Sequence, residues 1–193
     1  NMYEFSVAFA WGILGAYYWF EHKYHQRVLG LIALPVALAL LFYALSIPAG
    51  SDIEPLVPAL QNNLLLSVHV ATAIVAYGSF TIAFAAALLY LIQPESGRWG
   101  LPKPQILDEI GYRAIVVGFP FLTLTIVLGA LWADVAWGRY WGWDPKETAS
   151  LVTWFIYGAY LHARVVRGWR GRNAAILLII GFVLVVIAVG LAF

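Results

Sequence analysis

The sequence predicts an all-α fold: a polytopic transmembrane bundle of about six spanning helices with an outward-facing, Trp-rich loop. Of the 193 residues, 63% are hydrophobic and only 11% are charged, whereas a soluble domain carries about 25% charged residues. Several apolar stretches approach or exceed the roughly 20 residues that a helix needs to cross a bilayer. We therefore expect an integral membrane protein in contact with lipid. A soluble enzyme and a nucleic-acid-binding module are excluded, and the absence of cysteine excludes disulfides and thiolate metal sites.

Six apolar segments qualify as spans when the chain is read in windows of about 19 residues. The predicted spans cover residues 2–20, 28–47, 63–92, 112–134, 148–166 and 173–193. The segments between them are a basic turn, a Pro- and Gly-containing loop, a polar segment, the Trp-rich loop and a second basic turn, at 21–27, 48–62, 93–111, 135–147 and 167–172. We see no internal repeat and no soluble domain. Residues 1–193 are thus predicted to form one transmembrane domain, and the abrupt ends of the sequence lead us to expect the core of a longer chain.

The basic residues predict how the bundle is oriented. Nine of them fall on one side of the six-helix arrangement: Lys23, Arg27, Arg98, Lys103, Arg113, Arg164, Arg167, Arg170 and Arg172. Only Arg139 and Lys146 fall on the other side. Because Lys and Arg are enriched in cytoplasmic loops, the side with nine is predicted to be cytoplasmic, and the Trp-rich loop is predicted to face outward with both ends of the chain.

The Trp-rich loop is the most informative segment. It gathers four indoles within twelve residues, with Tyr140 among them: Trp132, Trp137, Trp141 and Trp143. One interpretation is an aromatic belt at the membrane interface. The other is a flat apolar platform for a large planar ligand. Arg139 and Lys146 are the only basic residues on this side, and they would suit a ligand that bears carboxylates.

The sequence Asp144-Pro145-Lys146-Glu147 predicts the start of the fifth helix. Asp is a favoured N-cap residue and proline suits the first helical position, while a glutamate three residues after the cap completes a capping box. Asp144 and Glu147 therefore have a structural role whatever else they do.

Two of the four histidines lie in apolar helices, where ionisable residues are uncommon and often functional. His69 lies six residues after the start of the third predicted span, at Asn63. At about 30 residues this span is longer than the hydrocarbon core, so we expect His69 near the outer face and level with the Trp-rich loop. His162 lies ~21 Å along its helix from Thr148, nearer the cytoplasmic side. The two depths predict two separate sites, although neutral imidazoles bonded to neighbouring helices remain the alternative. His22 and His25, in a basic turn, are expected to meet solvent or lipid headgroups.

The stretch WGRYWGWDPKETASLVTWFIYGAYLHAR, residues 137–164, resembles the WWD signature of the haem-handling cytochrome c assembly proteins. This family has the CcsA (ResC), CcmC and CcmF types. The continuation through DPKET, SLVTW and YLHAR is most similar to the CcsA type. The segments NMYEFSVAFAWGI and LLLSVHVATAIVAYGSF are also similar to that type, so the resemblance covers nearly the whole chain.

The resemblance implies roles for individual residues. His69 matches an external axial ligand to haem, and His162 matches a membrane-embedded haem ligand. The WWD core that would cradle the external haem matches Trp137, Trp141, Trp143 and Asp144. The family's second external histidine follows the last helix and has no counterpart here, and Ala149 stands where many relatives carry Trp.

The resemblance also implies a function. The protein would bind haem b in the membrane of a bacterium or a thylakoid and present it on the outer face to apocytochrome c, whose CXXCH thiols form thioethers with it. It would then be the haem-binding subunit of a cytochrome c synthase, and a CcsB (ResB) type membrane partner would supply the other ligand of the embedded haem. Two alternatives stay open: a CcmC-type protein that delivers haem to a carrier, and a structural subunit of a respiratory or photosynthetic complex.

Overall fold

The computed structural model describes residues 2–47, 64–93 and 100–190, and in these residues every regular element is helical. The predicted all-α fold is confirmed. The helices are α1 (Met2–Tyr24), η1 (Arg27–Leu29, a short 3-10 turn), α2 (Gly30–Ser46), α3 (Leu64–Ile92), α4 (Pro104–Trp137), α5 (Pro145–Arg167) and α6 (Arg172–Gly190). The predicted loop at 48–62 and the predicted role of Arg98 lie outside the described residues.

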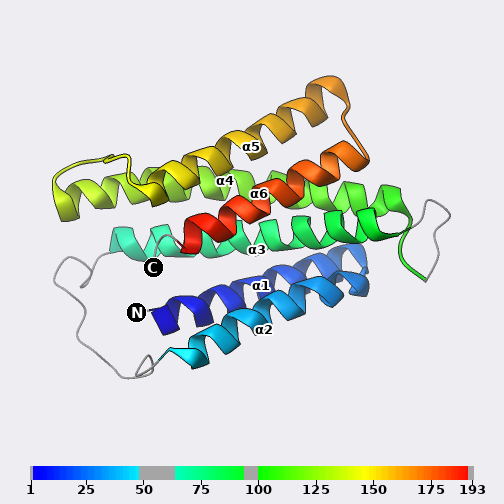
Figure 1. Ribbon diagram of the computed structural model, residues 1–193, viewed down its shortest axis with the longest axis horizontal. Coiled ribbons are helices and arrows are strands. Elements are labelled where there is room, and N and C mark those ends of the chain that lie inside the picture. The colour runs from blue at the N-terminus through cyan, green and yellow to red at the C-terminus, as the bar shows by residue number, and fades with distance from the viewer. Residues whose placement is uncertain (1, 48–63, 94–99, 191–193) are drawn as a thin grey trace.

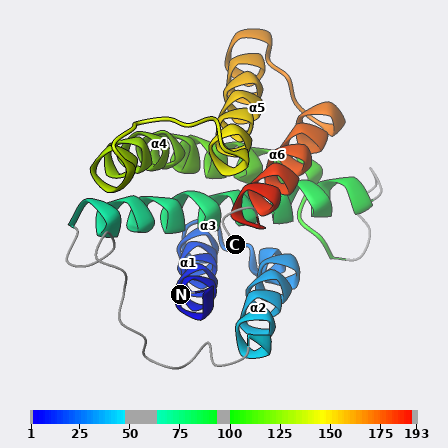
Figure 2. The ribbon, with the colours of Figure 1, turned by 60° about the vertical axis from the view of Figure 1, so that its left-hand side comes forward.

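The helices form one bundle in which successive helices run in opposite directions (Figure 1). Helix α3 is at its centre, with α1 and α2 on one side and α4, α5 and α6 on the other (Figure 2). We call the end that holds the turn at 138–144 the loop end. The opposite end holds the α1–α2 and α5–α6 turns, and we call it the basic end because most of the described Lys and Arg residues belong to it.

Among the residues that the structure describes, four helical segments are long and apolar enough to cross a bilayer: Arg27–Ser46, Leu64–Ile92, Pro104–Trp137 and Arg172–Gly190. Helices α1 and α5 are as long as several of these but less apolar, because Tyr, Trp and polar side chains replace aliphatic ones. The protein is thus a polytopic helical membrane protein whose six described α-helices match the six predicted segments in order.

Helix α4 differs most from its predicted extent. It begins at Pro104 rather than at 112, and it ends at Trp137 rather than at 134. Hydropathy windows exclude the first turns because they contain Asp108 and Glu109. Both carboxylates are paired with Arg164 of α5 in the folded chain, and proline is favoured in the first helical turn, so the helix continues through this polar segment.

Small residues let α1 approach α3 closely. A Cβ added to Gly78 of α3 would lie 2.7 Å from the carbonyl oxygen of Gly12 in α1. A Cβ on Gly12 would in turn collide with the side chain of Ile74. Small residues at helix interfaces are typical of membrane bundles, where association depends on close van der Waals packing.

We predict that Gly78→Ala lowers the stability of the protein by about 1–3 kcal/mol, the usual effect of overpacking. The added methyl group meets backbone, which cannot rotate away, so α1 has to shift. Gly15→Ala is the matched control, because a Cβ there meets no atom within 4 Å. Thermal unfolding of the detergent-purified variants would measure both. Equal melting temperatures for the two variants would contradict this account of the α1–α3 contact.

A candidate ligand site at the loop end

A cavity of about 530 Å³ opens at the loop end of the bundle. Helices α1, α3, α4, α5 and α6 and the turn at 138–144 all contribute to its walls. Its volume falls within the roughly 300–1,000 Å³ of typical small-molecule sites. The cavity brings together six of the eight residues predicted above to bind a ligand: His69, Trp137, Arg139, Trp141, Asp144 and Lys146. Trp143 and His162 are not in its walls.

His69 lies in the second turn of α3, with its ring against α4. Its Nδ1 is 2.8 Å from the carbonyl oxygen of Thr125. A carbonyl only accepts hydrogen bonds, so Nδ1 carries the proton and donates, and Nε2 keeps its lone pair. Metal-binding histidines usually donate their other ring N–H to a carbonyl or carboxylate in this way. The contact therefore leaves Nε2, in the wall of the cavity, as the ring nitrogen of His69 that can accept a bond.

Three residues that sequence reasoning missed hold His69 in place. The hydroxyl of Thr72 donates to the carbonyl of His69 (2.7 Å), and Thr125 Oγ1 lies 3.0 Å from Thr72 Oγ1. Gly129 provides the space for the ring, since a Cβ there would lie 2.8 Å from Cε1 of His69. The isolated glycine within an apolar helix is a signal of close approach, but the sequence does not say what approaches it.

The four indoles do not share one loop, which corrects the sequence-based expectation. Trp132 and Trp137 belong to the last turns of α4, which ends where Gly138 adopts a left-handed conformation (φ 72°). The two rings meet edge to face, with centroids 6.2 Å apart. Trp141 and Trp143 follow in the turn and form a second edge-to-face pair at 5.7 Å. Trp132, Trp137 and Trp141 all line the cavity, the first two from the end of α4 and the third from the turn that follows it.

Two of these indoles carry buried N–H groups without a partner. Nε1 of Trp132 and Nε1 of Trp141 are buried, and within the described residues no hydrogen-bond acceptor reaches them. Buried donors are normally paired, so an acceptor supplied by a ligand or by water would satisfy them. Trp143 differs, because it is 70% exposed and has a positive φ of 56°. Buried indoles beside a cavity favour the ligand platform over a simple interfacial belt.

The capping box at the start of α5 is confirmed. Asp144 Oδ1 accepts the backbone N–H of Glu147 (2.7 Å). The carboxylate of Glu147 returns the interaction, accepting the N–H of Asp144 (3.3 Å) and also that of Gly142 (2.7 Å). Glu147 therefore holds the turn that carries Trp141 against the start of α5. The carboxylate of Asp144 is thus engaged as the N-cap of α5.

In the described part of the chain, the cavity walls carry two cations, two carboxylates (Asp144 and Glu147) and a single imidazole. Arg139 and Lys146 both line it, and Arg139 lies over Gly142, where a Cβ would be 2.6 Å from Cζ. Among the described residues, no cluster of three or more His, Asp or Glu side chains could hold a metal ion. One histidine suits a metal that brings its own in-plane donors, and the two cations suit carboxylates on such a ligand.

His162 lies elsewhere, on the exposed side of α5. The exposed residues at helical spacing along this face are Val152, Phe155, Ala159, His162 and Val166. The two helical histidines thus belong to different parts of the molecule, one in a cavity wall and one on a surface.

The comparisons with known proteins agree with one another. The family described as "Cytochrome C assembly protein" matches residues 1–191. A relative from Guillardia theta, named "Cytochrome c biogenesis protein CcsA", is 37% identical and aligns with 96% of this chain and 69% of its own length. Relatives of the same name from Gloeothece citriformis and Pyropia yezoensis are 35% and 33% identical, each over 96% of this chain and over 73% and 72% of their own lengths.

We predict that Asp134→Asn lowers the pKa of Tyr140 toward its ordinary value. The Asp134 carboxylate accepts a hydrogen bond from the phenol of Tyr140, and its negative charge opposes the phenolate, so both effects raise the pKa of Tyr140. Asparagine keeps an acceptor but removes the charge. Tyrosinate absorption during an alkaline titration reports the pKa, and subtracting a matched Tyr140→Phe protein isolates this residue among 11 tyrosines. An unchanged titration would show that Asp134 does not control Tyr140.

Proposed function

The chain belongs to the cytochrome c assembly protein family, and from that premise we propose that it binds haem in the loop-end cavity and presents it to apocytochrome c. The resemblance to the CcsA type is confirmed, and the protein is an integral membrane component of cytochrome c biogenesis. One observation carries the proposal for the site: the Nδ1 proton of His69 is held by Thr125, which leaves Nε2 available at a cavity lined by indoles and two cations.

Each part of the cavity would have a defined task. His69 would be an axial ligand to the haem iron. Trp132, Trp137 and Trp141 would form apolar walls for the macrocycle, and Arg139 and Lys146 would pair with its propionate carboxylates. Trp143 and Asp144 would complete the cradle at the rim.

The protein's contribution to chemistry would be orientation and protection of the bound haem. The nucleophiles would come from apocytochrome c, because this chain has no cysteine. Each thiol of the CXXCH motif adds its sulfur to one vinyl carbon and its hydrogen to the other, forming a thioether. In this role the chain is the haem-binding subunit of a cytochrome c synthase, with haem b as its substrate.

His162 would serve a second haem within the membrane. Its exposed position on α5, in a stripe of apolar side chains, supports a site shared with another membrane protein. A CcsB (ResB) type partner would then supply the opposite ligand. By the positive-inside rule the loop end would face the periplasm, the cell exterior or a thylakoid lumen.

The CcmC-type alternative is disfavoured, because the relatives described above carry the CcsA name and align over nearly the whole chain. A structural subunit without haem is disfavoured by the arrangement of the cavity, where the imidazole tautomer is fixed and two indole donors lack acceptors.

The proposal is tested by reduced-minus-oxidised visible spectra of the detergent-purified protein and of two variants. We expect a b-type signal that falls in His69→Ala and, independently, in His162→Ala. The double variant should then have little or no haem. A haem-free wild-type protein, or a signal indifferent to both substitutions, would contradict the proposal.

We predict further that Gly129→Ala weakens loop-end haem binding by about 10–100-fold, the usual effect of disturbing a partner of a metal ligand. The added methyl group displaces the His69 ring and its bond to Thr125. Haem titration of the apoprotein in a His162→Ala background would isolate this site. Gly15→Ala is the control, since it adds the same methyl group in open space. Equal affinities for the two glycine variants would rule out a role for Gly129 in holding His69.

A further inference from the structure

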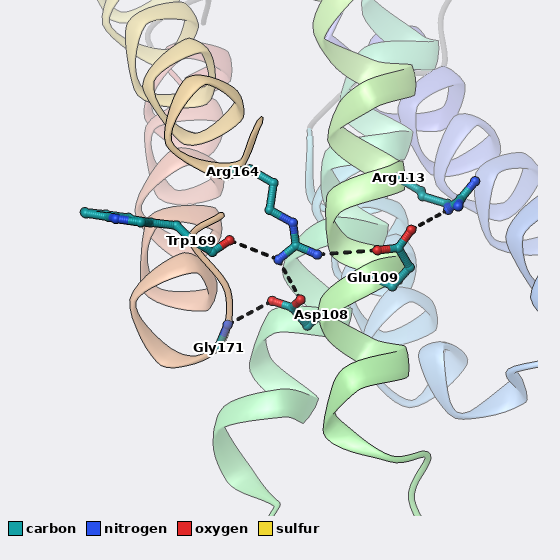
Figure 3. A network of polar contacts seen from close by, with 6 residues as sticks. All are labelled: Asp108, Glu109, Arg113, Arg164, Trp169 and Gly171. Atoms are coloured by element: carbon teal, nitrogen blue, oxygen red, sulfur yellow. Dashed lines mark hydrogen bonds and ion pairs between the residues drawn. The ribbon is translucent and has the colours of Figure 1, made fainter. Parts of the chain in front are cut away.

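A buried ion pair joins three segments at the basic end (Figure 3). Arg164 of α5 is 6% exposed, and its Nη1 lies 2.6 Å from Oδ2 of Asp108 in α4. The same nitrogen donates to the carbonyl of Trp169 (3.2 Å), while the other oxygen of Asp108 accepts the N–H of Gly171 (3.1 Å). The pair therefore ties the end of α5 and the α5–α6 turn to the start of α4. We call this arrangement the Arg164 clamp.

The clamp extends outward to partly exposed charges. Nη2 of Arg164 lies 3.4 Å from Glu109, which in turn binds the exposed Arg113 at 2.8 Å. The guanidinium also lies over the ring of Tyr112, 5.0 Å from its centroid. The contact of Arg164 with Asp108 is shorter and more buried than its contact with Glu109. Glu109 and Arg113 therefore provide a natural control for the Asp108 interaction.

Helix α5 has two opposite faces. Its inward face carries the buried residues Thr153, Tyr157, Tyr160 and Arg164. The hydroxyls of Tyr157 and Tyr160 are buried and find no hydrogen-bond partner in the described residues. In the second half of α5, directional polar contacts to neighbouring segments are therefore those of Arg164. A planar guanidinium bonded to a carboxylate fixes an angle as well as a distance.

His162 lies on the other face, two residues before Arg164. Successive residues of an α-helix are separated by about 100° around its axis, so these two side chains point in nearly opposite directions. Holding Arg164 inward therefore holds His162 outward. Buried ion pairs often add little net stability compared with apolar replacements, so the clamp is better explained by the orientation that it imposes.

We infer that Arg164 and Asp108 are positioning residues for His162: the clamp fixes the rotation of the last turns of α5 and thereby presents the imidazole on the outer face. This inference rests on the proposed function only where it assigns the presented imidazole to haem. The orientation itself is a property of the chain without any ligand.

The orientation can be measured directly because the chain contains no cysteine. His162→Cys creates a single attachment point for a methanethiosulfonate nitroxide on the full chain in lipid nanodiscs. With the clamp intact, we expect one spectral component with high accessibility to dissolved O₂. In the Asp108→Leu/Arg164→Met variant, which keeps apolar packing, we expect a second, more immobilised component. A spectrum unchanged by the double substitution would overturn the inference.

Two controls separate rotation from unfolding. Glu109→Gln should leave the nitroxide spectrum unchanged, and a change as large as that of the double variant would contradict the assignment to Asp108. The melting temperature and the loop-end haem signal report whether the bundle is intact. If the double variant does not accumulate, Asp108→Asn weakens the same contact and replaces it in the experiment. A second, more immobilised component is again expected, and an unchanged spectrum would again overturn the inference.

Haem content distinguishes this inference from the proposed function. With His162 present, the clamp variant should lose about tenfold in occupancy of the His162-dependent haem while the His69-dependent haem stays constant. A changed nitroxide spectrum with unchanged haem would confirm the clamp and refute the role of His162. An unchanged spectrum would refute the clamp whatever the haem content.

Discussion

The hydrogen bond from His69 to the backbone of Thr125 is the interaction on which the rest of the site depends. It joins the central helix α3 to α4, the helix against which α3 packs most extensively. It also places the ring proton of His69 on Nδ1, so that Nε2 is the nitrogen with the lone pair. Two further residues surround this hydrogen bond: Thr72 donates to the backbone carbonyl of His69, and Gly129 leaves room for its ring. Through the bond to Thr125, a neighbouring helix sets the tautomer of the imidazole, and with it the ring nitrogen that would bind the haem iron.

Helix α5 connects the two parts of the molecule for which we propose a function. Its first turn lies in the cavity wall, where the Asp144–Glu147 capping box secures the Trp-rich turn. Its last turns end in the Arg164 clamp, with His162 facing away from the bundle. One rigid element thus starts beside the loop-end site and ends beside the proposed embedded site. Both of its ends are held by carboxylates, in a protein with few charges.

Local sequence patterns correctly predicted the features that depend on residues close together in the chain. Apolar windows located the six helices, and the four residues from Asp144 predicted both the cap and the helix start. The contacts of Thr125 and Gly129 could not be predicted, because they depend on the register between α3 and α4. The start of α4 at Pro104 could not be predicted either. The acidic residues of its first turns are typical of a loop in the sequence, and their pairing with Arg164 of α5 is seen only in the folded chain. The division of the indoles between helix and turn followed from the extension of α4 to Trp137.

The most direct test of this account is electron–nuclear double resonance on the ferric haem protein labelled with ¹⁵N-histidine, in a His162→Ala background that leaves only the loop-end site. The account predicts a hyperfine coupling from one histidine nitrogen directly bound to iron, present in this protein and absent after His69→Ala. A coupling that persists without His69 would contradict the account, as would bound haem with no histidine coupling, because either result would place the iron on another ligand.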